Sequence, residues 1–483
     1  MLVLGAMHRI SSVSPIALVS ALLLANACSA SSDSAPASAP GATTTPPVTT
    51  APTPPAPTPR AIPAGYAEAL ADTITEVDGR TGLGPDLKVD ITKLQASALA
   101  LLQTGGKDVD AGFNLGIKAI LDAYPVGHLA IMPADTSKCG TPDLPYATTT
   151  VVGACTQPFA DHAVVTIAAA TNPLGLVAGD EIIGIDDKTN QAMLDAAIDR
   201  PMCTGGVPSA SARRARAATS VFAGVVVGTK VMIQHLSGLT ETKTVSKVSA
   251  PSSCGDPFSR GGYVAKASTR ADGVGVLHIP SFEPASFDTN DPQGTIDKFE
   301  AAIKVEFDKV KSAPYLVIDV RGNGGGSTEA ALAIVAGMPG ARTTEIAKCQ
   351  SRVPHKTTYT NDFTYTVEPS SDQFGYTGKV AILLDGNCFS ATDYFARAMR
   401  MATNAILVGR PEAGAYGGTT DQFKIDKGPG VEIYPDPWRC TDADGKLLEG
   451  QTAKLDAEVD LAPPDLTQGR DTDLETAVTL LKK

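Results

Sequence analysis

The clearest hydrophobic pattern in the chain lies between residues 378 and 417. Val380 to Leu384 form a short apolar run between glycines, which is typical of a buried strand. Asp385-Gly386-Asn387 follow as a turn signal. From Ala391 onward the apolar positions recur every three or four residues, which predicts a helix. Ser390 therefore stands at a strand-to-helix junction, directly before the first turn of the helix.

The position of Ser390 has two interpretations. A helix N-terminus offers unpaired N–H groups and the positive end of the helix dipole, so the N–H of Ala391 can stabilise an oxyanion beside a serine nucleophile. The alternative is an ordinary N-cap, because serine is common directly before helices. Taken alone, this stretch favours the N-cap.

A second stretch repeats the design. The apolar run Leu316 to Val320 ends in a glycine-rich turn, Gly322 to Gly326, and a helical pattern follows. Consecutive glycines expose backbone N–H groups, which suits oxyanion binding, although a plain tight turn would look similar. The turn is neither a G-x-G-x-x-G fingerprint nor a Walker A loop, so a nucleotide site is disfavoured.

Together the two units resemble the tail-specific (C-terminal-processing) serine peptidase family. Asp319-Val-Arg-Gly-Asn-Gly-Gly-Gly matches its D-[LV]-R-G-N-G-G-G turn, and Ser390-Ala-Thr-Asp matches its S-A-[ST]-[DE] nucleophile segment. The resemblance covers roughly Gly65 to the C-terminus. It implies an α/β fold: a crotonase/Clp-protease-like core of repeated strand–turn–helix units, a helical N-terminal segment and a PDZ-like β-rich domain. It also implies serine peptidase activity on protein or peptide substrates, without a cofactor.

The resemblance to one branch of the family indicates which residue is the catalytic base. Familiar members use a lysine in G-x-P-T-x-G-K, but Ala415 occupies that position, so a Ser–Lys dyad is excluded. The tricorn-like branch instead has a Ser–His–Glu arrangement. His128 follows a helical segment in a Gly-His pair, and Glu449 ends Asp444-Gly-Lys-Leu-Leu-Glu. The resemblance implies that His128 activates Ser390 and that Glu449 holds the other ring nitrogen.

The oxyanion hole is expected from the same resemblance. Backbone N–H groups of Gly324 or Gly325, together with Ala391, would bind the oxyanion. Asp393 is a rival carboxylate for the role of Glu449.

The chain divides into five segments by composition and pattern. The first reads as a secretory signal ending at Cys28, where a lipobox-like sequence favours lipidation over plain cleavage after Ala-Asn-Ala. The expected segments are signal peptide 1–28, Pro/Ala/Ser/Thr-rich disordered linker 29–63, helical region with the base-bearing strand 64–135, PDZ-like domain 136–260 and peptidase core 261–483.

The PDZ-like domain is indicated by Gly175-Leu-Val-Ala-Gly-Asp-Glu-Ile-Ile-Gly-Ile-Asp, which resembles the G-L-x-x-G-D-x-I-x-x-I-[ND] rhythm. Such domains bind peptide C-termini by adding a strand and capturing the terminal carboxylate. An insertion at 200–219 departs from the pattern and is expected to be a flexible loop or a cover over the groove. Its basic stretch, Arg213 to Arg216, is expected in a solvated loop.

Eight cysteines are present, and export would allow disulfides. Sequence proximity suggests Cys139–Cys155, Cys203–Cys254 and Cys349–Cys440, but connectivity cannot be deduced from sequence. With Cys28 set aside for lipidation, this set leaves Cys388, which we expect to be a buried core thiol.

The formal net charge of −12 argues against a nucleic-acid partner, and no metal-ligand spacing occurs. The sequence thus predicts an exported, lipid-anchored serine endopeptidase of the cell envelope, of unknown oligomeric state. Two alternatives remain: an inactive relative that binds peptides or ligands, and a crotonase-type acyl-CoA enzyme.

Overall fold

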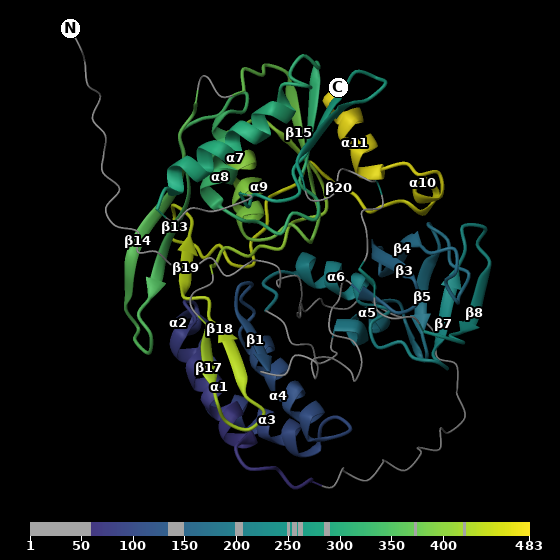
Figure 1. The fold of residues 1–483 in the computed structure, drawn as a ribbon, viewed down its shortest axis with the longest axis vertical. Helices are drawn as coiled ribbons and strands as arrows, with labels where there is room; N and C mark the ends of the chain where they lie inside the picture. Colours follow the sequence, from purple (N-terminus) through teal and green to yellow (C-terminus); the bar gives the residue numbers. More distant parts are fainter. Residues whose placement is uncertain are drawn as a thin grey trace, which may run out of the picture.

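The computed structural model describes residues 59–133, 149–198, 206–248, 252–253, 258, 264–284, 290–370, 374–418 and 422–483. The expected signal peptide with Cys28 and most of the expected linker lie outside these residues, as do Cys139, Cys203 and Cys254. Figure 1 shows a helical region, a β-rich unit and a sheet covered by helices.

The helical region confirms the helices predicted before His128. It contains α1 (Tyr66–Arg80), α2 (Gly84–Leu87), α3 (Ile91–Thr104) and α4 (Val109–Ala123). Asp90 and Asp108 cap α3 and α4 by accepting hydrogen bonds from backbone N–H groups. Beside these helices lies a small antiparallel sheet of β1 (Ala130–Pro133), β18 (Val431–Tyr434) and β17 (Phe423–Ile425). The N-terminal region therefore shares its hydrophobic core with strands from near the C-terminus.

The β-rich unit has its own hydrophobic core. Its antiparallel sheet has the order β3 (Ala154–Phe159), β4 (His162–Ala168), β5 (Glu181–Ile185), β7 (Lys230–Gln234), β8 (Thr240–Thr244), with β6 (Lys188–Thr189) beside β5. The helices α5 (Asn190–Ile198) and α6 (Ala210–Thr219) contribute to the same hydrophobic core as this sheet. Nearby in the sequence, β2 (Thr149–Thr150) pairs with β9 (Ser252–Ser253).

The expectation of a solvated basic loop is wrong. Arg213 to Arg216 lie in α6, and Arg216 is only 1% exposed. Arg214 pairs with Asp460 of the core at 2.6 Å. The buried alanines of α6 let the helix pack closely against its neighbours, because an alanine side chain is a single methyl group.

The third part is a six-stranded sheet, in which all neighbouring strands except the β10–β11 pair are parallel. Its order is β10 (Lys266–Thr269), β11 (Gly275–His278), β12 (Tyr315–Asp319), β15 (Lys379–Leu384), β16 (Ile406–Gly409), β20 (Ala457–Glu458). One face carries α7 (Pro292–Phe307), α8 (Thr328–Ala336) and α9 (Ala391–Ala402), whereas α11 (Thr472–Leu481) covers the other. The short helix α10 (Pro463–Thr467) precedes α11. Both predicted strand–turn–helix units are present, as β12–α8 and β15–α9.

A second small sheet joins distant parts of this region. It consists of β14 (Tyr359–Val367), β13 (Thr344–Arg352) and β19 (Trp438–Thr441). Cys349 and Cys440 lie opposite each other on β13 and β19 and form the predicted disulfide. Cys155 is also disulfide-bonded, but its expected partner lies outside the described residues. Cys388 is a buried free thiol, as predicted.

Candidate active site

Ser390 lies on a strained turn between β15 and α9. It is the N-cap residue of α9, with φ 60° and ψ −120°, and its side chain makes no capping hydrogen bond. A positive φ is costly for a residue with a Cβ and is common at functional sites. A sharp strand-to-helix turn of this kind exposes a serine hydroxyl above a sheet. Ser390 thus occupies the N-cap position, but the interpretation that its side chain serves as an ordinary cap, which the local sequence favoured, is wrong.

His128 supplies the partner of this hydroxyl. It lies between α4 and β1, and its Nε2 is 2.9 Å from Ser390 Oγ. Its ring packs against that of Phe389, with 4.7 Å between ring centroids. Burial lowers the pKa of His128 to about 3. The imidazole is thus neutral at pH 7, which a group that must accept a proton requires.

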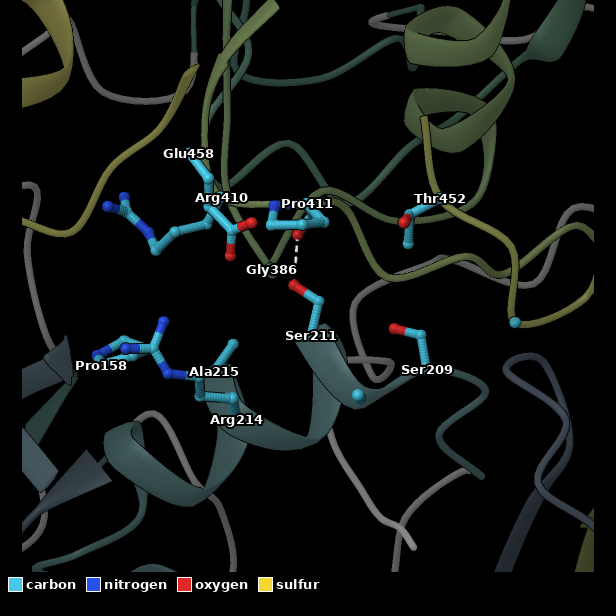
Figure 2. Close-up of a pocket in the computed structure, with 12 residues that line it drawn as sticks. Pro158, Ser209, Ser211, Arg214, Ala215, Gly386, Arg410, Pro411, Thr452 and Glu458 are labelled. Atoms are coloured by element: carbon cyan, nitrogen blue, oxygen red, sulfur yellow. Dashed lines mark hydrogen bonds between the residues drawn. The ribbon is translucent and has the colours of Figure 1, made fainter. Parts of the chain in front are cut away.

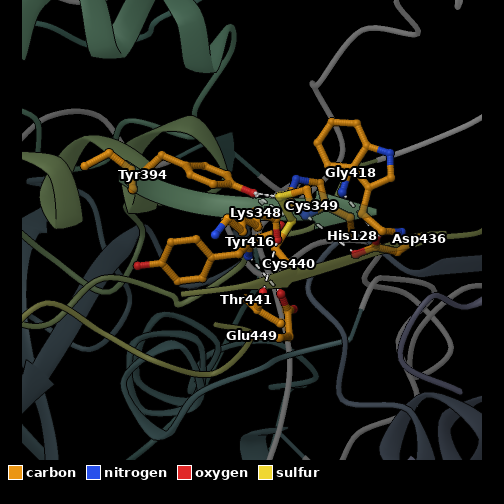
Figure 3. The surroundings of a disulfide bond; sticks show 12 residues. His128, Lys348, Cys349, Tyr394, Tyr416, Gly418, Asp436, Cys440, Thr441 and Glu449 are labelled. Carbon is orange, nitrogen blue, oxygen red and sulfur yellow. Dashed lines mark hydrogen bonds and ion pairs between the residues drawn. A yellow bond between two sulfur atoms is a disulfide. The ribbon is translucent and has the colours of Figure 1, made fainter. Parts of the chain in front are cut away.

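Glu449 lies close to His128 but does not bond to its ring. Its Oε1 accepts a hydrogen bond from the N–H of Gly127 at 2.6 Å, and its Oε2 accepts one from the N–H of Tyr416 at 2.8 Å. Within the part of the chain that the structure describes, His128 Nδ1 has no hydrogen-bond partner. The predicted hydrogen bond between Glu449 and His128 is therefore wrong, and Glu449 instead holds the backbone beside His128 (Figure 3).

Sequence reasoning missed a different carboxylate. Asp436 Oδ2 lies 4.0 Å from His128 Nδ1, which is close but beyond hydrogen-bonding distance. The only sequence signal was its setting between Pro435 and Pro437, which fixes the backbone on either side. Asp436 is fully buried, so its carboxylate is a fixed part of the site.

The rival carboxylate Asp393 has another role. Its two oxygens accept hydrogen bonds from the N–H groups of Gly414 and Ala415, at 2.6 and 3.1 Å. Ala415, at the position of the family's lysine, is fully buried. A Cβ on Gly127 would come within 2.5 Å of Ala415 Cβ, so the segment that carries His128 fills the space beside position 415.

The glycine turn touches the serine directly. A Cβ on Gly325 would come within 2.7 Å of Ser390 Cβ. However, the N–H of Gly325 donates to Asn323 Oδ1 at 2.8 Å, so this N–H is already engaged. Among the described residues, no acceptor is found for the N–H groups of Gly324 and Ala391. These two N–H groups are the ones left to bind an oxyanion.

The expected insertion contributes a docked helix beside the site. A cavity of about 330 Å³ lies between α6 and the core, and its lining includes Ser211, Arg214, Gly386 and Arg410 (Figure 2). Ser211 Oγ donates to the carbonyl of Pro411. Val207 and Ala212 belong to the same apolar cluster as Ala413, Ala415 and Phe389, so the insertion packs against the surroundings of Ser390.

A model of peptidase family S41 matches residues 273–459. The chain carries a peptidase family S41 domain. It is a serine-type peptidase on this basis, and the match includes both the glycine turn and Ser390. No curated protein matches the chain.

Solved structures give the fold over a longer range. Mature CPAF matches with a TM-score of 0.64 and 13% identity, over 86% of this chain and 96% of that one. Mature CPAF complexed with lactacystin matches with a TM-score of 0.61 and 15% identity, over 86% and 97%. At these identities the likeness shows a shared fold, which extends beyond the S41 domain to most of the described chain.

The close packing of Gly325 against Ser390 can be tested by substitution. Gly325→Ala places a Cβ against Ser390 at a φ of 103°, so we expect the serine to shift. A displacement of about 1 Å typically costs about 100-fold in rate. The measurement is kcat/KM on an unfolded protein substrate, with circular dichroism to verify folding. Gly324→Ala, whose Cβ meets no atom within 4 Å, should retain more activity. Equal losses in both variants would contradict this packing argument.

Proposed function

We propose that this protein is an exported serine endopeptidase in which Ser390 is the nucleophile and His128 the general base. The observation that carries the proposal is the 2.9 Å contact between Ser390 Oγ and His128 Nε2, made at a strained strand-to-helix turn. A serine hydroxyl becomes a useful nucleophile only when a neighbouring base removes its proton.

The chemistry then follows in two stages. Ser390 Oγ attacks the substrate's peptide carbonyl while His128 Nε2 takes the hydroxyl proton, and the N–H groups of Gly324 and Ala391 bind the oxyanion. His128 then gives the proton to the leaving amine, which leaves an acyl-enzyme. Water, deprotonated by His128, hydrolyses the acyl-enzyme and restores Ser390. Glu449 supports this chemistry as a positioning residue, because it fixes the backbone at Gly127.

Substrate engagement through C-termini is the second part of the proposal. The unit formed by residues 149–248 has a six-stranded sheet and the helix α5, and we assign it as a PDZ-like domain. The predicted turn occurs at Gly179-Asp180, where Asp180 accepts a hydrogen bond from the N–H of Val177. The docking of α6 against the apolar cluster around Phe389 connects this unit to the active site.

Export to the cell envelope and lipidation at Cys28 are the third part. The Cys349–Cys440 disulfide supports an oxidising compartment. In the part of the chain that the structure describes, no helix combines the length and apolar character needed to span a bilayer. In this proposal the lipid at Cys28 attaches the protein to the membrane through the linker 29–63.

Fluorophosphonate labelling of the full chain tests the nucleophile and base. We expect wild-type protein to label, Ser390→Ala to lose labelling, and His128→Ala to label at least about 100-fold more slowly because the base is missing. The control is Asp444→Asn, which replaces the carboxylate of an exposed residue by an amide. Absence of labelling in folded wild-type protein would contradict the proposal and favour an inactive binding protein.

C-terminal engagement predicts a dependence on the terminal carboxylate. A peptide substrate with a free C-terminus should be cleaved with a lower KM than the same peptide with an amidated C-terminus, because amidation removes the charge that a backbone nest binds. Steady-state kinetics on the two peptides provides the measurement. Identical KM values would contradict the proposal that substrates are bound through their C-termini, but they would not contradict the assignment as a peptidase.

Lipidation predicts a defined mature N-terminus. Mass spectrometry of protein purified from membranes should show Cys28 as the first residue, with a mass increase from attached acyl chains. Cys28→Ala should move the protein to the soluble fraction of the envelope, because only a lipid anchor is proposed to retain it. An unmodified Cys28 or a different first residue would contradict lipidation.

A further inference from the structure

Two buried polar atoms in the site face each other without a hydrogen bond. Among the described residues, neither His128 Nδ1 nor Asp436 Oδ2 has a hydrogen-bond partner, and the two atoms are 4.0 Å apart. Leaving a buried polar atom without a hydrogen bond destabilises the folded state, so such pairs are rare unless they have a function. Figure 3 shows the two side chains next to each other.

The small sheet brings the two chain segments together. The strands β1 and β18 are antiparallel, and their last pair is Ala130 opposite Tyr434. His128 lies two residues before Ala130, and Asp436 lies two residues after Tyr434, so both residues stand just beyond the same end of the paired strands.

Asp436 is held firmly in this position. Its Oδ1 accepts hydrogen bonds from the N–H groups of Gly418 and Trp438, both at 3.1 Å. Its carbonyl accepts a hydrogen bond from the N–H of Gly82 at 2.7 Å. Any Cβ on Gly417 would collide with Oδ2, at 1.7 Å. One oxygen is therefore anchored, and the other lies on the side of the histidine, where the backbone N–H of His128 helps to lower the pKa of Asp436 against the effect of burial.

Among the residues that the structure describes, the other carboxylates near the histidine are already engaged. Both oxygens of Glu449 are used by backbone N–H groups, and both oxygens of Asp393 are used in the same way. The titratable groups around His128 are therefore Asp436, Glu449 and, further away on α9, Asp393. Burial raises the pKa of Glu449, and the charge of Asp436 raises it further. Ionisation of Asp436 thus favours the protonated form of Glu449.

We propose that Asp436 is the positioning residue that accepts the Nδ1–H of His128 during catalysis, in place of Glu449. This inference rests on the proposed function of Ser390 and His128. When Nε2 accepts the proton of Ser390, the ring must carry its other proton on Nδ1, and the imidazolium that forms needs a nearby negative charge. A small movement of the His128 ring or of the Asp436 carboxylate closes the 4.0 Å gap.

The test is Asp436→Asn in the full chain, which keeps the side-chain shape and removes the charge. Selective ¹⁵N-histidine labelling reports the tautomer of His128 at pH 7, and kcat/KM reports activity across pH. In wild-type protein we expect a protonated Nδ1. In Asp436→Asn we expect the Nε2–H tautomer to appear and kcat to fall by about 1,000-fold or more, with little change in KM.

The pH profile adds a readout that a purely structural role would not change. Burial raises the pKa of Asp436 to about 7. In its ionised form, Asp436 favours the imidazolium and so raises the pKa of His128. The acid limb of kcat/KM should therefore move to lower pH in Asp436→Asn. Asp444→Asn, the same chemical change at an exposed position, should keep the wild-type tautomer and profile. Thermal unfolding shows whether each variant is folded.

The outcomes separate this inference from the proposed function. An unchanged tautomer and acid limb in Asp436→Asn would overturn the role of Asp436, even if the peptidase is active. A tautomer change in Asp436→Asn, in a wild-type protein that neither labels nor cleaves, would support the pairing while overturning the proposed function. If Asp436→Asn fails to fold, Gly417→Ala displaces the same carboxylate, and an unchanged tautomer there would equally overturn the inference.

Discussion

The antiparallel pairing of β1 with β18 is the contact on which the site depends. It joins a strand that follows the N-terminal helices to a strand near the C-terminus, and the helices pack against both. His128 lies two residues before β1, so the pairing of β1 with β18 brings the turn that carries the imidazole onto the C-terminal part of the chain. The nucleophile comes from a different sheet, so the base reaches it only if the N-terminal region folds onto the core. The active site is therefore complete only when the N-terminal region is packed against the core.

Within the core, the two strand–turn–helix units fix each other. The glycine turn after β12 lies against the serine turn after β15, and its Gly325 leaves no room for a side chain. Thr392 at the start of α9 donates to the carbonyl of Asn323, and Phe389 N–H donates to the same carbonyl at 3.1 Å. These contacts hold Ser390 in its strained conformation, since a positive φ persists only where the surroundings over-determine it.

Local pattern predicted much of this arrangement. The apolar runs and their turns gave both units, the position of Ser390 and the buried character of Cys388, because each depends on residues close in sequence. Two of the failures involve contacts between residues far apart in the sequence. The composition of Arg213 to Arg216 indicates exposure, yet Asp460 and the core bury this helix. The partners of Glu449 are backbone N–H groups far away in the sequence, and motif matching carries no information about them.

The buried carboxyls form a setting that suits a neutral histidine as the base. Asp393, Glu412 and Glu449 lie around Ala415, and burial raises the pKa of each. They hold the surrounding loops by accepting backbone hydrogen bonds. The space beside position 415 is filled by the segment that carries His128, because a Cβ on Gly127 would come within 2.5 Å of Ala415 Cβ. The same burial that favours the uncharged form of each carboxyl lowers the pKa of His128, so the imidazole is neutral and can accept the proton of Ser390.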